Sequence, residues 1–377
     1  MAIPDSMKAV QVVEYNQPYV LNTVAVPKDL EPHDLLVKVA VASFCHTDLM
    51  VLEGKFGGTK KPITGSHEGS GTVVAIGSAV AASREFKVGD RVMCGTPRNT
   101  CGACGECTGP ESNRQYCSAL EGHCGVLSVD GFFAEYARVD ARWTTLLPDN
   151  VSLLAAAPLA CAGRTVWRGL QQAIQHASLK PRSWVCVVGA GGGLGHMAVQ
   201  FAVQSGMRVI GIDARPEGLA ATREAGAELV LDARDGKDAN VAAVQKVTGA
   251  LAGGVDATLL VADVTSAAAL ACAVTRKHGT VVELAQPDSF TIPFAELIMR
   301  DIKLVGSCFC SPQESRDMVA SIQKHGIELH TVPFQGLEKI HELVELVHSG
   351  KIKGKAAIVV DDAQVQRDVT LAGTSKL

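Results

Sequence analysis

The chain has 377 residues, more than the roughly 250–300 at which one hydrophobic core stops growing, so two domains are expected. Apolar residues make up 47% and charged residues 20%, which indicates a folded globular protein. The formal net charge of −4 gives no electrostatic reason to expect nucleic acid or an anionic membrane as partner. No apolar run reaches the ~18 residues of a membrane span.

Short strands and turns are predicted up to about residue 155, for example at 35–44 and 69–78, where β-branched runs are bounded by Pro, Gly and Ser. From about residue 165, apolar strands alternate with helical stretches. These strands lie at 183–190, 207–213, 227–233, 256–262, 279–285 and 303–308. Such alternation predicts an α/β fold with a doubly wound parallel sheet.

The C-terminal tail contains predicted helices at 311–326 and 337–350 and a strand at 355–362. It has no place in a six-stranded sheet and is expected to rejoin the first domain. The predicted division is therefore 1–160 with 310–377 as one domain, and 161–309 as the other.

The 12 cysteines are unevenly distributed. The start, MAIPDSMKAV, lacks the basic and apolar stretches of a secretory signal, so a cytoplasmic, reducing location is expected. In that environment clustered thiols suggest metal binding rather than disulfides. Six cysteines crowd between Cys94 and Cys124, whereas Cys45 and Cys161 stand apart, a pattern that two metal sites would explain.

The first predicted metal site is a C-x₂-C-x₂-C-x₉-C array. Its ligands would be Cys101, Cys104, Cys107 and Cys117. Four thiolates suit a closed, tetrahedral structural zinc. A redox dithiol or an iron–sulfur cluster are the alternatives, and Cys124 is the reserve for the fourth ligand.

The second predicted metal site joins Cys45, His67 and Cys161. Two thiolates and one imidazole that leave one position open form a known catalytic zinc arrangement. Each of these residues taken singly could equally be an ordinary core residue.

The glycine-rich run GAGGGLGHMAVQFA follows the strand VCVV and predicts a dinucleotide site. Glycines here permit a tight turn and a close approach to a pyrophosphate at a helix N-terminus. The residues expected to contact the cofactor are Gly189, Gly191, Gly192, Gly193, Leu194 and Gly195.

Asp213 ends the next strand, near the ~20-residue offset at which an acid hydrogen-bonds the ribose hydroxyls of NAD. Its charge would repel a 2′-phosphate, so NAD is favoured over NADP, although Arg215 could soften that preference. The alternative is a glycine-rich turn and a strand-end acid without a cofactor.

Together these motifs resemble the medium-chain dehydrogenase/reductase superfamily, specifically its zinc-containing alcohol dehydrogenases of the yeast-like, tetramer-forming type. The similarity includes FCHTDLM, GSHEGSGTVVAIG, the four-cysteine array, LACAGRTVWRGL, GAGGGLGHMAVQFA, KLVGSC and SGKIKGK. It implies a mainly β GroES-like catalytic domain carrying both zinc sites and a Rossmann NAD-binding domain. It also implies reversible hydride transfer between an alcohol and NAD, and a homotetramer or homodimer with KLVGSC as a plausible contact edge.

The resemblance assigns the catalytic zinc to Cys45, His67 and Cys161, and the structural zinc to the four-cysteine array. It implies that Glu68 can approach the catalytic metal and that Asp48 orients His67.

In the same resemblance, Thr47 hydrogen-bonds the alcohol oxygen and exchanges its proton. His46 and Lys355 match positions that contact the cofactor pyrophosphate.

Three features depart from the family pattern. The last gap of the four-cysteine array is longer than that of the family, which makes Cys117 the preferred fourth ligand and Cys124 the reserve. Met50 stands where a histidine commonly completes the proton relay. Thr96 and Phe56 stand where ethanol-preferring relatives have tryptophans, so a pocket for bulkier primary or secondary alcohols is expected. The competing hypotheses are zinc-free enoyl or quinone reduction, altered chemistry on a specialised biosynthetic intermediate, and a non-catalytic NAD-binding protein.

Overall fold

The computed structural model describes residues 2–251 and 253–374, with side chains described up to residue 368. The chain forms two compact units. The first contains Met1–Arg164, Cys310–Gly326 and Thr331–Leu377, and the second contains Thr165–Phe309 and Ile327–His330. Cys161 therefore belongs to the first unit, because the helical turn that carries it continues to Gly163 before α5 (Arg164–Ala177) begins.

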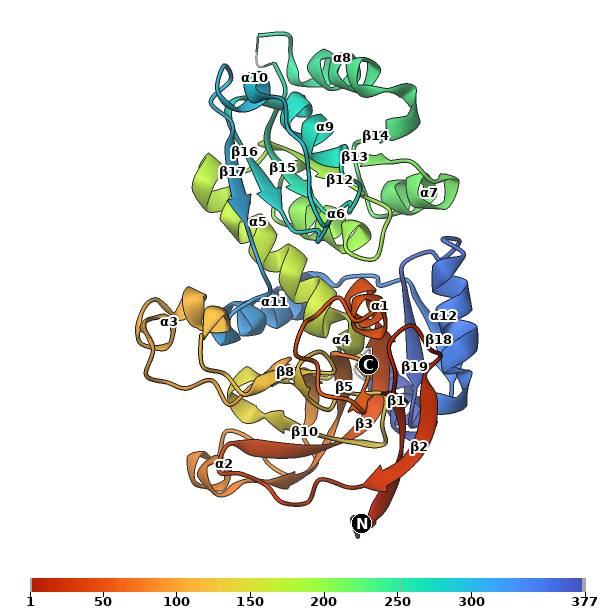
Figure 1. The fold of residues 1–377 in the computed structure, drawn as a ribbon. Coiled ribbons are helices and arrows are strands. Elements are labelled where there is room, and N and C mark those ends of the chain that lie inside the picture. The colour runs from red at the N-terminus through yellow and green to blue at the C-terminus, as the bar shows by residue number, and fades with distance from the viewer. Residues whose placement is uncertain (1, 252, 375–377) are drawn as a thin grey trace. The chain divides into compact units, whose positions relative to one another are not determined.

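The first unit is mainly β (Figure 1). Its strands are β1 (Ser6–Val12), β2 (Val20–Ala25), β3 (Asp34–Phe44), β4 (Ile63–Thr64), β5 (Glu68–Ile76), β6 (Arg91–Cys94), β7 (Pro97–Arg98), β8 (Gly122–Cys124), β9 (Ser128–Val129), β10 (Tyr136–Asp140), β11 (Thr145–Leu146), β18 (Thr331–Gln335) and β19 (Lys355–Val359).

The helices of the first unit are mostly short. They are α1 (His46–Leu52), α2 (Ser78–Ser83), α3 (Gly105–Thr108), η1 (Glu111–Tyr116), η2 (Ala141–Trp143), α4 (Leu153–Pro158), η3 (Leu159–Gly163), α11 (Pro312–His325), η5 (Leu337–Lys339), α12 (Ile340–His348) and α13 (Asp362–Thr374).

A seven-stranded sheet forms the centre of the first unit. Its order is β11-β6-β5-β3-β19-β18, with β10 paired to β3. β19 pairs antiparallel with β3, from Ala356 opposite Phe44 to Val359 opposite Val41, so the C-terminal tail is built into this sheet. The core that results combines side chains from both ends of the chain, for example Val37 and Ile358. Two smaller sheets, β2-β1-β4 and β7-β8-β9, complete the unit.

The second unit contains one six-stranded parallel sheet. Its strands are β12 (Trp184–Val188), β13 (Arg208–Asp213), β14 (Leu229–Asp232), β15 (Val255–Leu260), β16 (Thr275–Glu283) and β17 (Lys303–Gly306). The order β14-β13-β12-β15-β16-β17 is that of a Rossmann fold. All five residues of β12 are buried, because a central parallel strand has both faces covered. The predicted α/β fold class is confirmed.

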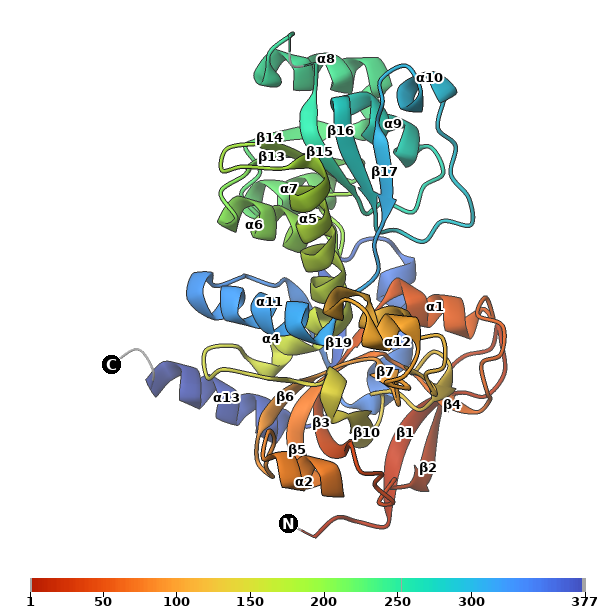
Figure 2. The same cartoon turned by 90° about the vertical axis from the view of Figure 1, so that its left-hand side faces the viewer.

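Helices cover this sheet, as Figure 2 shows from the side. They are α5 from Thr165 onward, α6 (Gly195–Gln204), α7 (Pro216–Glu224), η4 (Ala233–Asp235), α8 (Lys237–Thr248), α9 (Ala267–Val274) and α10 (Phe294–Leu297). α6 and α7 contact β13, whereas α9 contacts β15 and β16. The switch in strand order beside β12 places the ends of β12, β13 and β15 next to one another, the usual ligand position in such sheets.

Candidate metal centres and cofactor pocket

The first unit brings four separated metal-ligand side chains together. One donor atom from each of Cys45, His67, Glu68 and Cys161 lies within 4.8 Å of the others. Cys45 is the residue before α1, His67 and Glu68 lie at the start of β5, and Cys161 lies in η3. Because these elements are far apart in the sequence, the group exists only in the folded unit.

Asp48 positions two of these ligands at once. Its Oδ1 lies 3.0 Å from Nδ1 of His67, and its Oδ2 accepts a 2.8 Å hydrogen bond from the backbone N–H of Cys45. The second bond also caps α1. Asp48 and His67 are both buried, so this geometry is shielded from water.

His67 has the features of a metal ligand. Its Nε2 is buried and has no hydrogen-bond partner among the described residues. Because Asp48 holds the Nδ1 side of the ring, Nε2 is left for an electron-pair acceptor. Burial opposes protonation of His67, but Asp48 and then Cys161 raise its pKa, so metal binding there would release a proton. The residues present fit zinc.

Lys355 supplies a buried cation beside the ligands. Its Nζ lies 3.0 and 2.8 Å from the two carboxylate oxygens of Glu68, and Oε1 of Glu68 also accepts a bond of 3.3 Å from the N–H of Ala162. Burial raises the pKa of Glu68 to about 7, and Lys355 opposes that rise. The nearest partner of Lys355 is thus the metal-site carboxylate, and its predicted contact with a cofactor pyrophosphate stays a prediction.

α1 carries the residues predicted to handle the alcohol and its proton. His46 is exposed, whereas Thr47 and Met50 are partly buried. Phe56 is partly buried against the core of the first unit, and Thr96 is buried. The catalytic role of Thr47 and the pocket-lining roles of Phe56 and Thr96 stay predictions.

The four-cysteine array forms a second cluster. Donor atoms of Cys101, Cys104, Cys107 and Cys117 all lie within 4.8 Å of one another. Sulfur–sulfur distances of 3.6, 3.9 and 4.0 Å match the edge of about 3.8 Å that follows from tetrahedral geometry and Zn–S bonds of about 2.3 Å. A disulfide would require about 2.05 Å. This donor set also fits zinc.

Backbone N–H groups stabilise the thiolate form of the cysteine array, which is the form that binds metal. Those of Ala103 and Cys104 lie 3.5 and 3.3 Å from the sulfur of Cys101. N–H groups of Cys107 and Ser118 lower the pKa of Cys104 to about 6, which favours the thiolate that binds metal. Cys124 lies instead in the hydrophobic core, where burial raises its pKa to about 12. Cys117, and not Cys124, therefore completes the array.

In the second unit, the glycine-rich turn joins β12 to α6. Gly189 has φ of +89°, and a Cβ on Gly191 would lie 2.0 Å from the carbonyl oxygen of Gly218. A Cβ on Gly195 would lie 2.1 Å from the carbonyl oxygen of Gly189. Gly192, Gly193 and Leu194 are partly exposed at the start of α6. The turn thus leaves backbone accessible at a helix N-terminus, which suits a phosphate group.

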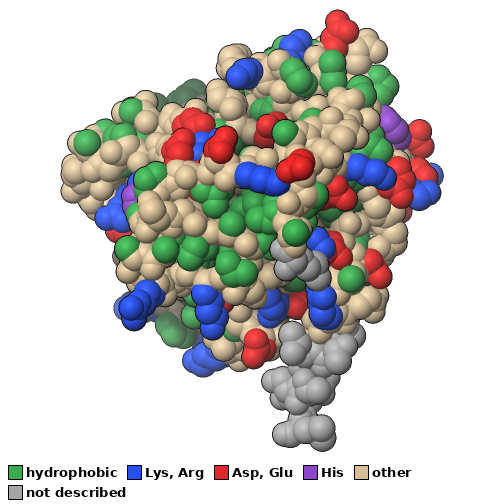
Figure 3. All heavy atoms as spheres, turned by 90° about the horizontal axis from the view of Figure 1, so that it is seen from below, with side chains coloured by type: hydrophobic (Ala, Val, Ile, Leu, Met, Phe, Trp, Pro, Cys, Tyr) green, Lys and Arg blue, Asp and Glu red, His purple; other side chains and the backbone are tan. Residues whose placement is uncertain are grey.

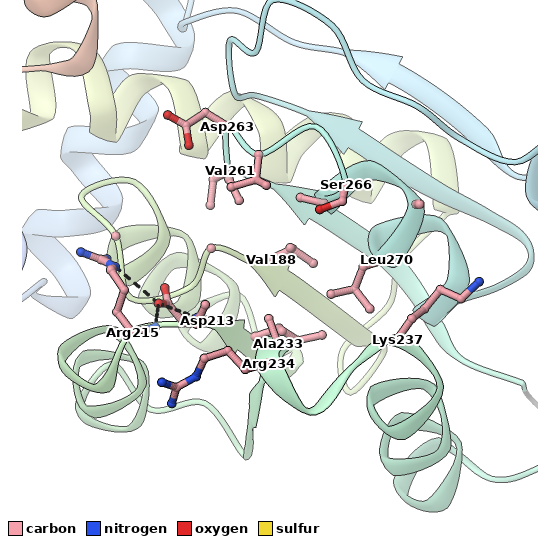
Figure 4. Close-up of a pocket in the computed structure, with 18 residues that line it drawn as sticks. Val188, Asp213, Arg215, Ala233, Arg234, Lys237, Val261, Asp263, Ser266 and Leu270 are labelled. Atoms are coloured by element: carbon pink, nitrogen blue, oxygen red, sulfur yellow. Dashed lines mark hydrogen bonds and ion pairs between the residues drawn. The ribbon is translucent and has the colours of Figure 1, made fainter. Parts of the chain in front are cut away.

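Asp213 is hydrogen-bonded to this glycine-rich turn. Its Oδ2 accepts a 2.9 Å bond from the N–H of Gly191, and its Oδ1 accepts bonds of 2.9 and 3.0 Å from the N–H groups of Ala214 and Arg215. Asp213 therefore both fixes the turn and presents a carboxylate at the end of β13 (Figure 4).

A cavity of about 740 Å³ lies along the ends of β12, β13 and β15. Its lining is largely apolar, with Val188 and Leu270 labelled among others in Figure 4. Arg215, Arg234 and Lys237 also line it. Nε of Arg215 lies 3.6 Å from Oδ1 of Asp213, so both charges face the same part of the cavity. Its volume suits a nucleotide moiety.

Two features were missed from the sequence. One is the Lys355–Glu68 ion pair, which spans 287 residues and carries no local signal. The other is His123 in β8, whose pKa is lowered to about 4, first by burial and then by the charges of His67 and Arg164. A histidine within a strand beside the cysteine array was the only available signal.

The surface supplies little further information on partners. In Figure 3, cationic and anionic side chains are interspersed around an apolar area on the face shown. Among the described residues, no helix has both the length and the apolar character needed to cross a membrane.

Two family descriptions match the chain. Residues 31–149 match the alcohol dehydrogenase GroES-like domain, and residues 193–324 match the zinc-binding dehydrogenase domain.

Relatives and solved structures agree with these matches. An alcohol dehydrogenase from Schizosaccharomyces pombe is 31% identical, covering 96% of this chain and 99% of the relative. Alcohol dehydrogenase 1 from Emericella nidulans is 34% identical, covering 94% and 98%. The solved alcohol dehydrogenase from Aeropyrum pernix has a TM-score of 0.82 and 27% identity, covering 93% of this chain and 99% of that structure.

Proposed function

The chain belongs to the zinc-dependent alcohol dehydrogenases, and from this premise we propose that it oxidises primary or secondary alcohols bulkier than ethanol, reversibly, with NAD. The products are the corresponding aldehydes or ketones. The observation that carries the proposal is the Cys45–His67–Cys161 group, in which Cys45 and His67 are buried and Cys161 is partly buried, with Nε2 of His67 left for a metal by the Asp48 bond at Nδ1.

Cys45, His67 and Cys161 would hold the catalytic zinc, and Cys101, Cys104, Cys107 and Cys117 the structural zinc. When bound, the catalytic zinc supplies a Lewis acid that makes an alcohol proton acidic enough to leave near neutral pH, and NAD supplies the hydride acceptor. Asp48 fixes the imidazole of His67, while Lys355 balances the charge of Glu68.

Thr47 takes the alcohol proton and returns it during carbonyl reduction. Its hydroxyl is partly buried on α1, two residues after Cys45. A hydroxyl can accept one proton only while giving up its own, so the proton must continue to solvent. Met50 carries no group for this step, so the proton would pass through the cofactor ribose and water, or through another residue such as the exposed His46.

NAD, rather than NADP, is the proposed cofactor because Asp213 presents a carboxylate to the 740 Å³ cavity. The pyrophosphate would lie over Gly192, Gly193 and Leu194, where the turn is accessible. Arg215 pairs with Asp213 and offsets part of its negative charge. The repulsion between Asp213 and a 2′-phosphate is therefore weaker than it would be without Arg215.

We propose a pocket larger than that of ethanol-preferring relatives. Thr96 has a small side chain where the family pattern has tryptophan, and Phe56 is smaller than the second tryptophan. Removing one indole ring frees space comparable to several carbon atoms of substrate.

We propose a homodimer or homotetramer of the yeast-like type in which β17 contributes to a contact. β17 is an edge strand of its sheet, hydrogen-bonded only to β16 among the described strands. Phe294, Ile298 and Met299, which precede β17 in the chain, are 67%, 71% and 68% exposed. Exposed apolar side chains and an unpaired strand edge both favour pairing with a second copy.

A reducing, cytoplasmic location is also proposed. None of the 12 cysteines, all of which lie in the described residues, forms a disulfide, which agrees with a metal-binding protein in a reducing compartment.

The test is NADH absorbance from purified protein with NAD and alcohols ranging from ethanol to bulky secondary and aromatic ones. The proposal expects turnover that is higher for the bulky alcohols. Zinc-loaded protein that binds NAD but turns over none of them would contradict it.

A further inference from the structure

Ser66, the residue before the proposed ligand His67, has an unusual backbone conformation. Its φ is +66°, in the left-handed region that residues with a Cβ rarely adopt because the Cβ crowds the backbone. Among the described non-glycine residues with positive φ, Ser66 is the only buried one; Asn99 is partly buried and the others are exposed. Glycine adopts this conformation without crowding. A buried serine here therefore indicates that its side chain has a role of its own.

The backbone of Ser66 is held on one side by the segment that follows β8. The N–H of Phe132 donates a 3.0 Å hydrogen bond to the carbonyl oxygen of Ser66. A Cβ on Gly125 would lie 2.2 Å from this oxygen, and one on Gly131 would lie 1.9 Å from it. These close contacts fix the orientation of the Ser66 carbonyl group, so the surrounding structure maintains the strained conformation.

The hydroxyl of Ser66 joins two segments that carry proposed zinc ligands. Its Oγ donates a 2.8 Å hydrogen bond to the carbonyl oxygen of Ser43 and accepts one of 3.3 Å from the N–H of Glu68. Ser43 lies two residues before Cys45, and Glu68 directly follows His67. The bond between Ser66 and Ser43 therefore fixes the backbone of one ligand segment relative to the other.

Ser43 extends this connection to a third strand. β5, β3 and β19 are neighbours in the central sheet of the first unit (Figure 1). The Oγ of Ser43 donates a 3.2 Å hydrogen bond to the carbonyl oxygen of Ala356, next to Lys355, whose ammonium group pairs with Glu68. Both serines are buried, so water cannot replace either hydroxyl bond. The two hydroxyls thus connect the strand ends that carry the metal group and its buried cation.

We propose that Ser66 is a positioning residue of the catalytic metal group: its hydroxyl sets the backbone of His67 relative to that of Cys45, so that both donor atoms meet one zinc ion. The proposal rests on the zinc-dependent function proposed above. Asp48 fixes the rotation of the imidazole, whereas Ser66 fixes the backbone from which the imidazole projects. Loss of the hydroxyl lets the two segments shift apart, which lowers metal affinity without removing a ligand.

The test removes the hydroxyl and the backbone strain separately. Ser66→Ala removes the hydroxyl but keeps a Cβ in the left-handed conformation, whereas Ser66→Gly removes both. Ser70→Ala is the matched control. Ser70 lies in β5, is also buried, and donates a 2.6 Å hydrogen bond to the carbonyl oxygen of Leu153. Each variant thus loses one buried hydroxyl bond, but only the Ser66 variants lose the bond between the ligand segments.

The measurement is the zinc affinity of the catalytic site, obtained by competition with a chelator, together with the visible absorption of protein loaded with Co²⁺. Cys161→Ser identifies the cobalt bands of this site, because it should retain only the four-cysteine array. Both Ser66 variants should bind zinc about 3- to 10-fold more weakly, the range of one hydrogen bond, and should shift those bands. Ser70→Ala should lose thermal stability but keep the wild-type affinity and bands.

Thermal melting at saturating zinc separates this role from a purely structural one. Ser66→Gly should melt at a higher temperature than Ser66→Ala, because glycine relieves the strain, yet both should bind zinc more weakly than the wild type. Wild-type affinity and unchanged cobalt bands in the Ser66 variants would overturn the proposal, and so would an equal loss of affinity in Ser70→Ala. If Ser66→Ala does not fold, Ser66→Gly alone decides between these results.

The two proposals fail separately. If the protein oxidises alcohols but its zinc affinity does not depend on the Ser66 hydroxyl, only the positioning role is overturned. If zinc affinity depends on that hydroxyl but no alcohol is oxidised, the proposed reaction fails and the positioning role is supported.

Discussion

Replacing Asp48 by asparagine should show whether zinc binding at the site depends on Asp48 beyond its contribution to folding stability. Asp48 accepts two hydrogen bonds, one linking it to Nδ1 of His67 at 3.0 Å and one from the N–H of Cys45 at 2.8 Å. An amide has one oxygen, so its NH₂ group would meet one of these two donors. The side chain is buried, and water cannot take over the lost bond.

The size of the effect follows from these two bonds. Loss of a partner that orients a ligand histidine typically lowers metal affinity about 10- to 100-fold, which is about 1.4–2.8 kcal/mol. An unsatisfied buried donor costs a further ~1–3 kcal/mol of folding stability. Asp48→Asn should therefore bind the catalytic zinc more weakly and unfold at a lower temperature.

The assay is dialysis of the variant against a zinc chelator of known affinity, followed by metal analysis and a thermal melt. Asp140→Asn is the matched control, because Asp140 is also buried and accepts bonds from two backbone N–H groups, those of Asn99 and Arg142. The control should lose stability but keep the zinc held by Cys45, His67 and Cys161. Equal zinc retention by both variants would refute the role of Asp48.

Three further outcomes are expected. Thr47→Ala should lower kcat by about 10²–10⁴-fold at unchanged zinc content while Thr47→Ser stays active, and near-normal turnover of the alanine variant would remove Thr47 from the mechanism. Asp213→Asn should raise the ratio of kcat/KM for NADP over NAD at least ~10-fold, because the charge that repels a 2′-phosphate is gone. The variant Asp256→Asn, at the start of β15 and outside the cavity lining, should leave that ratio unchanged. Cys104→Ser should lose one zinc per subunit and lower the melting temperature, since structural metal binding contributes folding energy; a stable variant with both zincs would contradict this.

The Rossmann sheet could be predicted from the sequence because each strand contains a short apolar run. β12 and β15 are buried along most of their length, so hydrophobicity alone identifies them. The β-rich unit was less regular, and its two-residue strands such as β7 and β9 have too few residues for any periodicity.

The metal groups differ in how far local spacing indicates them. Cys101, Cys104 and Cys107 are close in sequence, so their clustering was predictable, and Cys117 was the preferred fourth ligand. Setting aside the reserve, Cys124, needed the fold, which places it in the core. Cys45, His67 and Cys161 become neighbours only when the starts of α1 and β5 come together with η3. No spacing links these residues, so the sequence indicated the group only through its ligand chemistry and the family resemblance.

Only one of the contacts that tune the site was predicted: the resemblance implied that Asp48 orients His67. The second bond of Asp48, from the N–H of Cys45, depends on where α1 begins and was not predicted. Lys355 reaches Glu68 only because β19 pairs with β3 across most of the chain length. Such contacts arise from tertiary packing, so neither the composition of the sequence nor the spacing of its residues indicates them.

The central claim is that Cys45, His67 and Cys161 hold the zinc on which alcohol oxidation depends. It is tested most directly by measuring zinc content and alcohol-dependent NADH formation on the same samples of wild type and Cys161→Ser. The account predicts two zincs per subunit and turnover in the wild type, and one zinc with no turnover in the variant. Turnover in Cys161→Ser at a single zinc per subunit would contradict it.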